Sequence, residues 1–158
     1  MTDLGHGKDL VRRYLEDVFS NGNVAAVDKY LSGDRFVEGV IDLVNRWRTA
    51  FSDFQLTVDA AIAEDDRVVT VEVLTGTHDG IYQSRIGPVS PTGRTVKWSR
   101  IAIRALRDGR FVEGFGEEDD LGLLQQLGVL AGPTGQADPH HRLRVLAEHG
   151  SDARSRTP

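Results

Sequence analysis

Residues 98–128 constrain the fold of this chain more than any other stretch. Two runs of strand-like residues flank the tetrapeptide RDGR at 107–110. An Asp-Gly pair between two such runs is a strong hairpin signal, because both residues tolerate the positive φ that tight hairpin turns need. The second run reaches about Gly116 and is soon followed by the apolar, helix-compatible segment LGLLQQL. The stretch therefore predicts two long antiparallel strands and a short helix.

Helices are expected before the strands. Apolar residues recur on one helical face in three segments, over about residues 8–19, 24–31 and 36–51. The period then changes: residues 54–60 alternate as in a strand, and 68–77 is rich in β-branched residues, as in a strand covered on both faces. Residues 80–93 are rich in Gly and Pro and are expected to form a loop. Helices followed by strands predict an α+β fold, with the helices in the concave side of a curved antiparallel sheet.

Composition narrows the class of protein. A chain of 158 residues with 39% apolar and 27% charged residues is expected to be globular, with one main domain. Its net charge of −5 argues against nucleic acid or an anionic membrane as a partner. The chain has no cysteine, which excludes disulfides and thiolate chemistry. No stretch approaches the roughly 20 apolar residues of a membrane span, and a cytoplasmic protein is expected.

Two segments differ in character along the chain. Residues 1–130 are expected to form the folded domain. Residues 131–158 begin with the linker-like AGPTGQ and read as a tail, with a short helix at 139–149 and then disorder. The histidines of this tail lack partners at metal-ligand spacing, so no metal site is expected from them: His140, His141 and His149.

Four consecutive acids, residues 117–120, join the second hairpin strand to the predicted helix. Acids ahead of a helix complement its N-terminal dipole, so capping explains some of them. Four exceed what capping needs, and this excess points to chemistry. Asp120 is the expected cap, and Asp119 is either another acid at the start of the helix or the one that carries chemistry.

Several short motifs together resemble those of a known family. In order they are DF at 53–54, EDDRVV at 64–69, TGTHDG at 75–80, PTGR at 91–94, RDGR at 107–110, and Asp119 with LGLLQQLG at 121–128. With the element order, they make the chain resemble the SnoaL-like polyketide cyclases of the nuclear transport factor 2-like superfamily, over about residues 8–130. The resemblance implies a cone-shaped fold. The sequence departs from the family pattern at Glu113-Gly114-Phe115, where many relatives carry Glu, then His or another polar residue, then Trp.

The resemblance implies catalytic roles for two residues. Asp119 matches the acid that removes a proton from carbon flanked by carbonyls and later returns it. Repulsion from its acidic neighbours and partial desolvation suit a carboxylate for this work. His78 follows a strand and would donate to a substrate oxygen or shuttle a proton, unless it is a turn histidine bonded to nearby backbone.

A polycyclic substrate also needs walls and a group that stabilises negative charge. Arg100 and Trp98 share a face of their strand, so Arg100 would stabilise an enolate if that face lines the site. Arg104 has the same parity, which favours an outward face for both arginines. Five aromatic residues are expected to line the substrate or pack in the core: Tyr14, Trp47, Phe51, Trp98 and Phe115.

The expected function is a cofactor-free polyketide cyclase of antibiotic biosynthesis that closes a ring by intramolecular aldol condensation. No phosphate loop, dinucleotide fingerprint or nucleophile elbow is present in the sequence. The alternatives are a polyketide hydroxylase of the same fold and a non-catalytic small-ligand-binding protein. An epoxide hydrolase is ranked low, since no second Asp is well placed on an adjacent strand. The outer-parity side chains Val69, Val71 and Val73 need cover, which predicts a homodimer.

Overall fold

The computed structural model describes residues 4–132. A helical segment comes first, made of α1 (Leu4–Tyr14), a π-helical turn (Leu15–Ser20) and a 3₁₀-helix (Val24–Lys29). α2 (Asp34–Ala50) follows, and then the strands β1 (Gln55–Glu64), β2 (Arg67–Thr77), β3 (Tyr82–Ser84), β4 (Gly87–Val89), β5 (Thr95–Arg107) and β6 (Arg110–Glu118). The short helix α3 (Asp120–Gln126) ends the described chain. The predicted order of helices, strands and a last helix is confirmed.

The four long strands form one antiparallel sheet in the order β1-β2-β5-β6. The β5–β6 hairpin pairs Arg107 with Arg110, and its turn has φ of 51° at Asp108 and 75° at Gly109. These positive angles are the ones that the Asp-Gly signal predicts. The loop expected at 80–93 instead contains a small β3–β4 hairpin, whose three-residue strands are too short to show a period.

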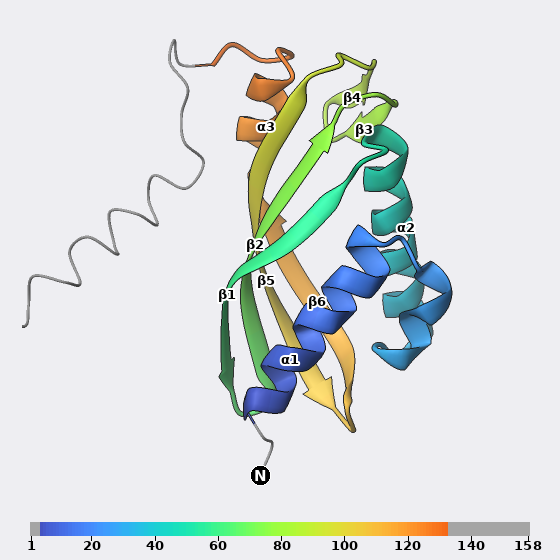
Figure 1. Cartoon of the computed structure of the whole chain (residues 1–158), viewed down its shortest axis with the longest axis vertical. Coiled ribbons are helices and arrows are strands. Elements are labelled where there is room, and N and C mark those ends of the chain that lie inside the picture. The colour runs from blue at the N-terminus through green and yellow to red at the C-terminus, as the bar shows by residue number, and fades with distance from the viewer. Residues whose placement is uncertain (1–3, 133–158) are drawn as a thin grey trace, which may run out of the picture.

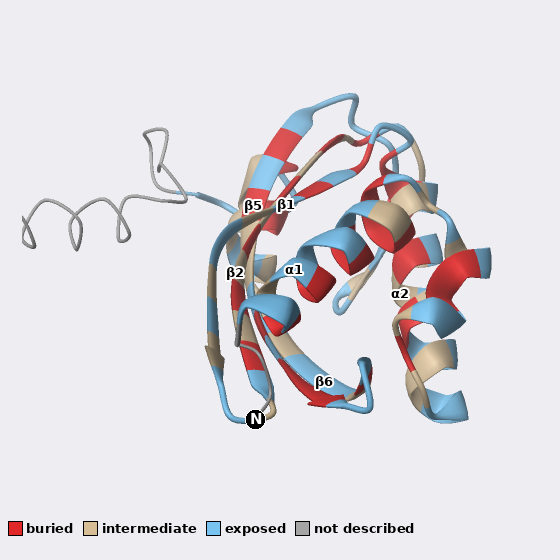
Figure 2. Ribbon diagram, turned by 60° about the horizontal axis from the view of Figure 1, so that its bottom comes forward, coloured by how far each residue is buried: buried red, intermediate tan, exposed pale blue. Residues whose placement is uncertain are grey.

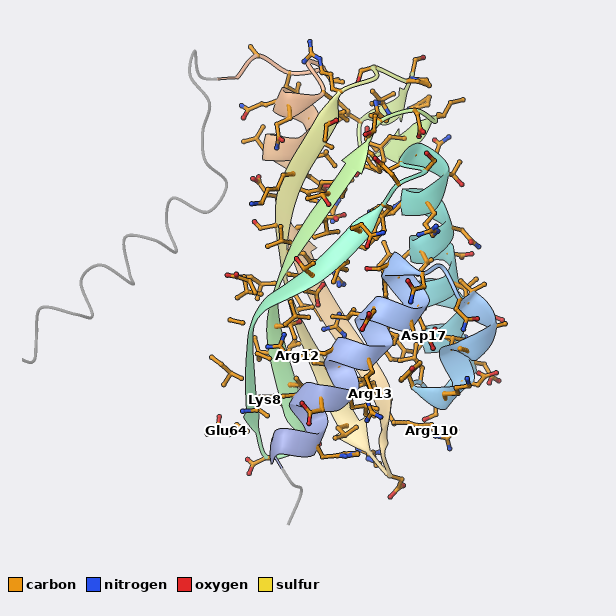
Figure 3. The ribbon with its side chains drawn as sticks, in the orientation of Figure 1. Lys8, Arg12, Arg13, Asp17, Glu64 and Arg110 are labelled. Carbon is orange, nitrogen blue, oxygen red and sulfur yellow. The ribbon has the colours of Figure 1, made fainter. Side chains whose placement is uncertain are left out.

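The sheet curves around the helices (Figures 1 and 2). α1 lies in the hollow of the sheet, α2 lies beside it, and α3 packs near one end of β5. Arg12, on the side of α1 that faces β1, donates to the carbonyl oxygen of Val58 at 3.2 Å (Figure 3). The predicted α+β architecture, with helices on the concave side of a curved antiparallel sheet, is confirmed.

The core lies between the helices and the inner face of the sheet. Its largest fully buried side chains include Trp47, Trp98, Tyr14, Phe51 and Phe54. On β2 the two faces differ: every second residue is buried, and the residues between them are partly exposed. The prediction that both faces of this strand are covered is therefore not met by the described residues alone.

The predictions for the C-terminal tail cannot be compared with this fold. The tail beyond residue 132, with its expected helix at 139–149 and its three histidines, lies outside the described residues. Within residues 4–132, no helix is long and apolar enough to cross a membrane.

Candidate functional site

Three charged residues stand in one row across the inner face of the sheet. Glu72 of β2 pairs with Arg100 of β5, and Arg100 pairs with Glu118 of β6. Side chains on neighbouring strands at paired positions share a face, so all three lie on the helix-covered side. A basic residue thus has a carboxylate on each side, and the row, with Thr70 and Arg104 beside it, is the polar part of this face.

The arginines of β5 face inward, against the sequence-based expectation. The Arg104 side chain is 4% exposed and that of Arg100 is 12% exposed. A glycine of β6 makes room for Arg100, because a Cβ at Gly116 would lie 2.5 Å from Nη2 of Arg100. Gly114 lies opposite Arg104 in the same way, but a Cβ there would be in ordinary contact with Arg104, 3.4 Å from its Cγ. The prediction of an outward face was wrong. Alternation along a strand shows which residues share a face, but it does not show which residues of other strands lie against them.

Glu72 is held tightly. Its Oε1 accepts from the Thr70 hydroxyl at 2.6 Å and from Arg104 Nη2 at 2.8 Å, and its Oε2 accepts from Arg100 Nη1 at 3.0 Å. Burial alone would raise the pKa of Glu72, but Arg104, Arg100 and the Thr70 hydroxyl outweigh it and hold that pKa below its usual range. Glu72 is therefore ionised at neutral pH and neutralises the two arginines that it contacts.

Glu118 is held loosely. Its side chain is 11% exposed, with Oε2 3.4 Å from Trp98 Nε1 and Oε1 3.5 Å from Arg46 Nη2 of α2. Burial and the nearby Asp120 carboxylate raise the pKa of Glu118, against the smaller opposing effects of Arg46, Trp98 and Arg100. The two carboxylates that flank Arg100 thus have pKa values displaced in opposite directions.

Aromatic rings surround this charged row. Trp47 lies 5.8 Å from the Arg100 guanidinium carbon and stacks on Phe54 at 5.3 Å. Phe51 contacts Trp98 at 5.1 Å between ring centroids, and Arg104 lies over the Tyr14 ring at 5.7 Å. Of the predicted site residues, the structure brings Tyr14, Trp47, Phe51, Trp98 and Arg100 to the inner side of the sheet.

Phe115 is placed on the other face. It is 64% exposed and pairs with Ile103, one position out of phase with the inward-facing Gly114 and Gly116. A wall role at the inner face is therefore not available to it. The error has a physical cause, because an aromatic residue in a half-buried strand is equally compatible with a buried and an exposed face.

His78 is buried beside Phe51, with the ring centroids 5.4 Å apart. The Thr92 amide donates to His78 Nδ1 at 3.2 Å, and burial lowers the pKa of His78, so the neutral ring carries its proton on Nε2. That Nε2 is buried and has no hydrogen-bond partner among the described residues. A neutral donor is thus available there, and the structure also shows the turn contact that was the alternative.

The acids around His78 have a structural role. Asp53 accepts from the Thr77 amide at 2.6 Å and the Thr77 hydroxyl at 2.8 Å, while Asp79 accepts from the amide and hydroxyl of Ser52. These reciprocal bonds tie the end of α2 to the end of β2. The motifs DF and THDG therefore have a structural role, because their hydrogen bonds hold the loop that carries His78 in place.

Asp119 is the cap of α3. It is exposed, and its Oδ1 accepts from the Gly122 amide at 2.9 Å. Asp120 instead accepts from the Tyr82 hydroxyl at 3.5 Å and pairs with Arg85 at 3.0 Å. The expected assignment of the cap to Asp120 was wrong by one residue, because β6 continues to Glu118 and α3 begins immediately after Asp119.

This assignment gives a first prediction. Asp119→Ala is expected to lower the free energy of unfolding by about 0.5–2 kcal/mol, since it removes the cap, whereas Asp119→Asn retains one and should change it little. Asp120→Ala is the matched control and should cost less, because its partner Arg85 is largely exposed. Urea unfolding measures all three. A larger loss in Asp120→Ala than in Asp119→Ala would contradict the cap assignment.

Sequence reasoning missed several polar groups of the inner face, namely Glu72, Arg46, Tyr82 and the role of Glu118. One signal was present: a lone glutamate within the apolar run VVTVEVL, which calls for a buried cation. Among residues 4–132 no group of three or more His, Asp or Glu side chains is arranged to hold a metal ion.

Comparison with known proteins now decides the family. The family model for SnoaL-like polyketide cyclases matches residues 9–127. The chain belongs to this family. No curated protein matches the sequence significantly.

Solved structures support the family's fold. A candidate polyketide cyclase from Acidithiobacillus ferrooxidans is 27% identical, with a TM-score of 0.67 over 83% of this chain and 100% of its own. AclR, a candidate hydroxylase from Streptomyces galilaeus, is 25% identical, with a TM-score of 0.71 over 94% of this chain and 98% of its own. TsrD from Streptomyces laurentii is also 25% identical, with a TM-score of 0.70 over 82% of this chain and 100% of its own. This SnoaL-like chain therefore has relatives named for two different reactions.

Proposed function

We propose that this SnoaL-like protein is a cofactor-free polyketide cyclase that closes a ring by intramolecular aldol condensation. The observation that supports the proposal best is the Glu72–Arg100–Glu118 row set among aromatic rings. Aldol closure needs a carboxylate to remove a proton and a cation to stabilise the enolate oxygen. Planar apolar walls suit a polycyclic substrate.

The row reaches solvent at one side. The Arg46 side chain is 38% exposed while its partner Glu118 is 11% exposed, so this pair lies where the core meets water. A substrate would approach there and bind at this edge of the core, beside Arg46 and Glu118. Two neighbouring acids are candidates for the proton transfer: Asp119, to which the resemblance points, and Glu118, which lies on the inner face.

Product mass tests the reaction. The purified protein would be incubated with candidate tricyclic polyketide esters, and the products would be separated and weighed by mass spectrometry. Ring closure leaves the mass unchanged, or lowers it by one water if dehydration follows. Absence of any ring-closed product across substrates that cyclise slowly without protein would refute the proposal.

Hydroxylation is the second candidate, favoured by the similarity to AclR. It would raise the product mass by one oxygen and would consume molecular oxygen together with a two-electron reductant, which reduces the second oxygen atom to water. The same incubation distinguishes the two reactions, since ring closure leaves the product mass unchanged or lowers it, whereas hydroxylation raises it. A ligand that binds and is recovered unchanged would favour a non-catalytic binding protein.

We also propose that the protein is a homodimer formed through the outer face of the sheet. One apolar row crosses all four strands on this face, because Ile62 pairs with Val69, Val69 with Ile103, and Ile103 with Phe115. Three of these side chains are 38–68% exposed. A second copy applies an identical row to this one under two-fold symmetry, which is how isologous interfaces form.

A further inference from the structure

We infer that Glu118, rather than Asp119, is the carboxylate that takes and returns the proton during ring closure. The inference rests on the proposed cyclase function and assigns the residue that performs its central step.

Glu118 lies beside a cation on the inner face of the sheet. Glu118 ends β6 on the inner face, directly across from Arg100, and it is flanked by α2 through Arg46. A base acting at this place has the enolate-stabilising guanidinium of Arg100 on the neighbouring strand. Proton removal and stabilisation of the resulting charge would then occur side by side.

The hydrogen bonds of Glu118 are longer than those of Glu72. The contacts of Glu118 with Trp98 and Arg46 are 3.4 and 3.5 Å, at the long end of hydrogen-bonding distance. The three contacts of Glu72 are 2.6–3.0 Å. Glu118 thus keeps acceptor capacity for a substrate proton, whereas Glu72 has committed its oxygens to buried cations.

The titration of the two carboxylates agrees with this division of roles. The groups that face Glu118 are Arg46 from α2, Trp98 and Arg100 from β5, Asp120 from α3, and Tyr82, whose own pKa is raised by burial and by Glu118 and Asp120. Burial and Asp120 prevail and raise the pKa of Glu118 toward the range where a group can both accept and donate. When the pKa values of two nearby acids are shifted in opposite directions, the shifts indicate which acid can transfer a proton.

Unpaired donors point to a polar ligand at the same place. Among the described residues, Arg46 Nε and Trp47 Nε1 are buried and have no hydrogen-bond partner. Arg46 pairs with Glu118, and fully buried Trp47 lies beside Arg100. A buried donor without an acceptor costs about 1–3 kcal/mol, so the Nε of Arg46, beside Glu118 at the solvent edge, would favour an acceptor such as a carbonyl oxygen of a polyketide.

Asp119 lacks these features. It is exposed, and the Gly122 amide occupies one of its oxygens as the cap of α3. No contact with Arg46, Trp98 or Arg100 is found for it among the described residues. Its position therefore supports helix stability better than proton transfer on the inner face.

The step balances without a co-reactant. The Glu118 carboxylate takes the proton of a carbon between two carbonyl groups, and the electrons of that C–H bond become the enolate. The enolate carbon forms a bond to the carbon of a ketone in the same molecule, and the ketone π electrons move to its oxygen. Protonated Glu118 gives its proton to that oxygen, which restores the carboxylate.

The decisive experiment compares three isosteric variants in the full chain: Glu118→Gln, Asp119→Asn and Glu117→Gln. Glu118→Gln should lower kcat by about 10²–10⁴-fold with a smaller change in KM, the usual contribution of a positioned acid–base group. Asp119→Asn should lower kcat less than about tenfold, since Asn also caps a helix. Glu117→Gln, on the exposed outer face opposite Ile101, should leave kcat unchanged.

Each outcome separates this inference from the proposed function. If the wild type cyclises a polyketide and Glu118→Gln does so equally fast, Glu118 is not the base and the function stands. If Asp119→Asn carries the large loss, the family acid is the base. If the wild type forms no ring-closed product, both the function and the inference fail.

A measurement without substrate guards against a folding artefact. The carboxyl carbon of Glu118 would be followed by NMR through a pH titration, assigned by its absence in Glu118→Gln. Its midpoint should lie above 4.5, the ordinary value for glutamate. Because a raised pKa makes ionised Glu118 destabilising above that ordinary value, Glu118→Gln should unfold at an equal or higher urea concentration at neutral pH. A midpoint at or below 4.5 would overturn the inference.

Discussion

Glu72→Gln is expected to lower the free energy of unfolding by about 3–5 kcal/mol at neutral pH, a large part of the stability of a domain this size. The substitution keeps the shape and removes the one carboxylate within residues 4–132 that contacts the guanidiniums of Arg100 and Arg104 directly. Removing one partner of a buried ion pair leaves an uncompensated charge in a medium of low dielectric constant. Urea or thermal unfolding measures the loss.

The dependence of this loss on pH follows from the lowered pKa of Glu72. A carboxylate whose pKa is lower in the folded state contributes stability above its unfolded pKa, here about 4.5, and loses it as the pH falls through the folded pKa. The difference between wild type and Glu72→Gln should therefore be full at pH 7 and shrink below about pH 4.5.

Two comparisons make this prediction specific. Glu38→Gln, on the exposed side of α2, should change the unfolding free energy by less than about 0.5 kcal/mol. Replacing Glu72, Arg100 and Arg104 together by apolar residues should cost less than Glu72→Gln alone, because no charge is then left unpaired. A loss below about 1 kcal/mol in Glu72→Gln would show that the ion cluster does not stabilise the fold.

The Glu72 cluster also shows why some features could be predicted from the sequence and others could not. The β5–β6 hairpin follows from a local pair, Asp108 and Gly109, whose φ preferences act within one turn. The inward face of Arg100 depends instead on β2, which supplies Glu72 from 28 residues away in sequence. Parity within one strand cannot report that partner.

The candidate site illustrates the same limit at the scale of a single residue. Four consecutive acids mark the end of β6 as important, but which acid faces inward depends on where the strand ends. The structure ends β6 at Glu118, which gives the cap to Asp119 and the inner face to Glu118. Element boundaries are the least certain part of a sequence prediction, and here one position changes which carboxylate can reach a substrate.

The outer face of the sheet carries the second large prediction. The row Ile62–Val69–Ile103–Phe115 leaves large apolar side chains exposed on all but β2, where Val69 is partly exposed. Exposed apolar rows of this kind mark interfaces between proteins. Phe115→Glu should raise the dimer dissociation constant by roughly 30- to 1,000-fold, the effect of losing about 2–4 kcal/mol at an interface centre.

Sedimentation equilibrium over a range of micromolar concentrations measures this change. Ile86→Glu is the matched control: it places the same charge at a 60% exposed isoleucine of the β3–β4 turn, away from the long sheet, and should leave the dimer intact. The rival occupant of the outer face is the segment 133–158 of the same chain. If a second copy covers the row, the variant that lacks this segment should still sediment with the mass of a dimer. A wild type that is monomeric, and that gains mass when the segment is deleted, would show instead that the tail covers this face.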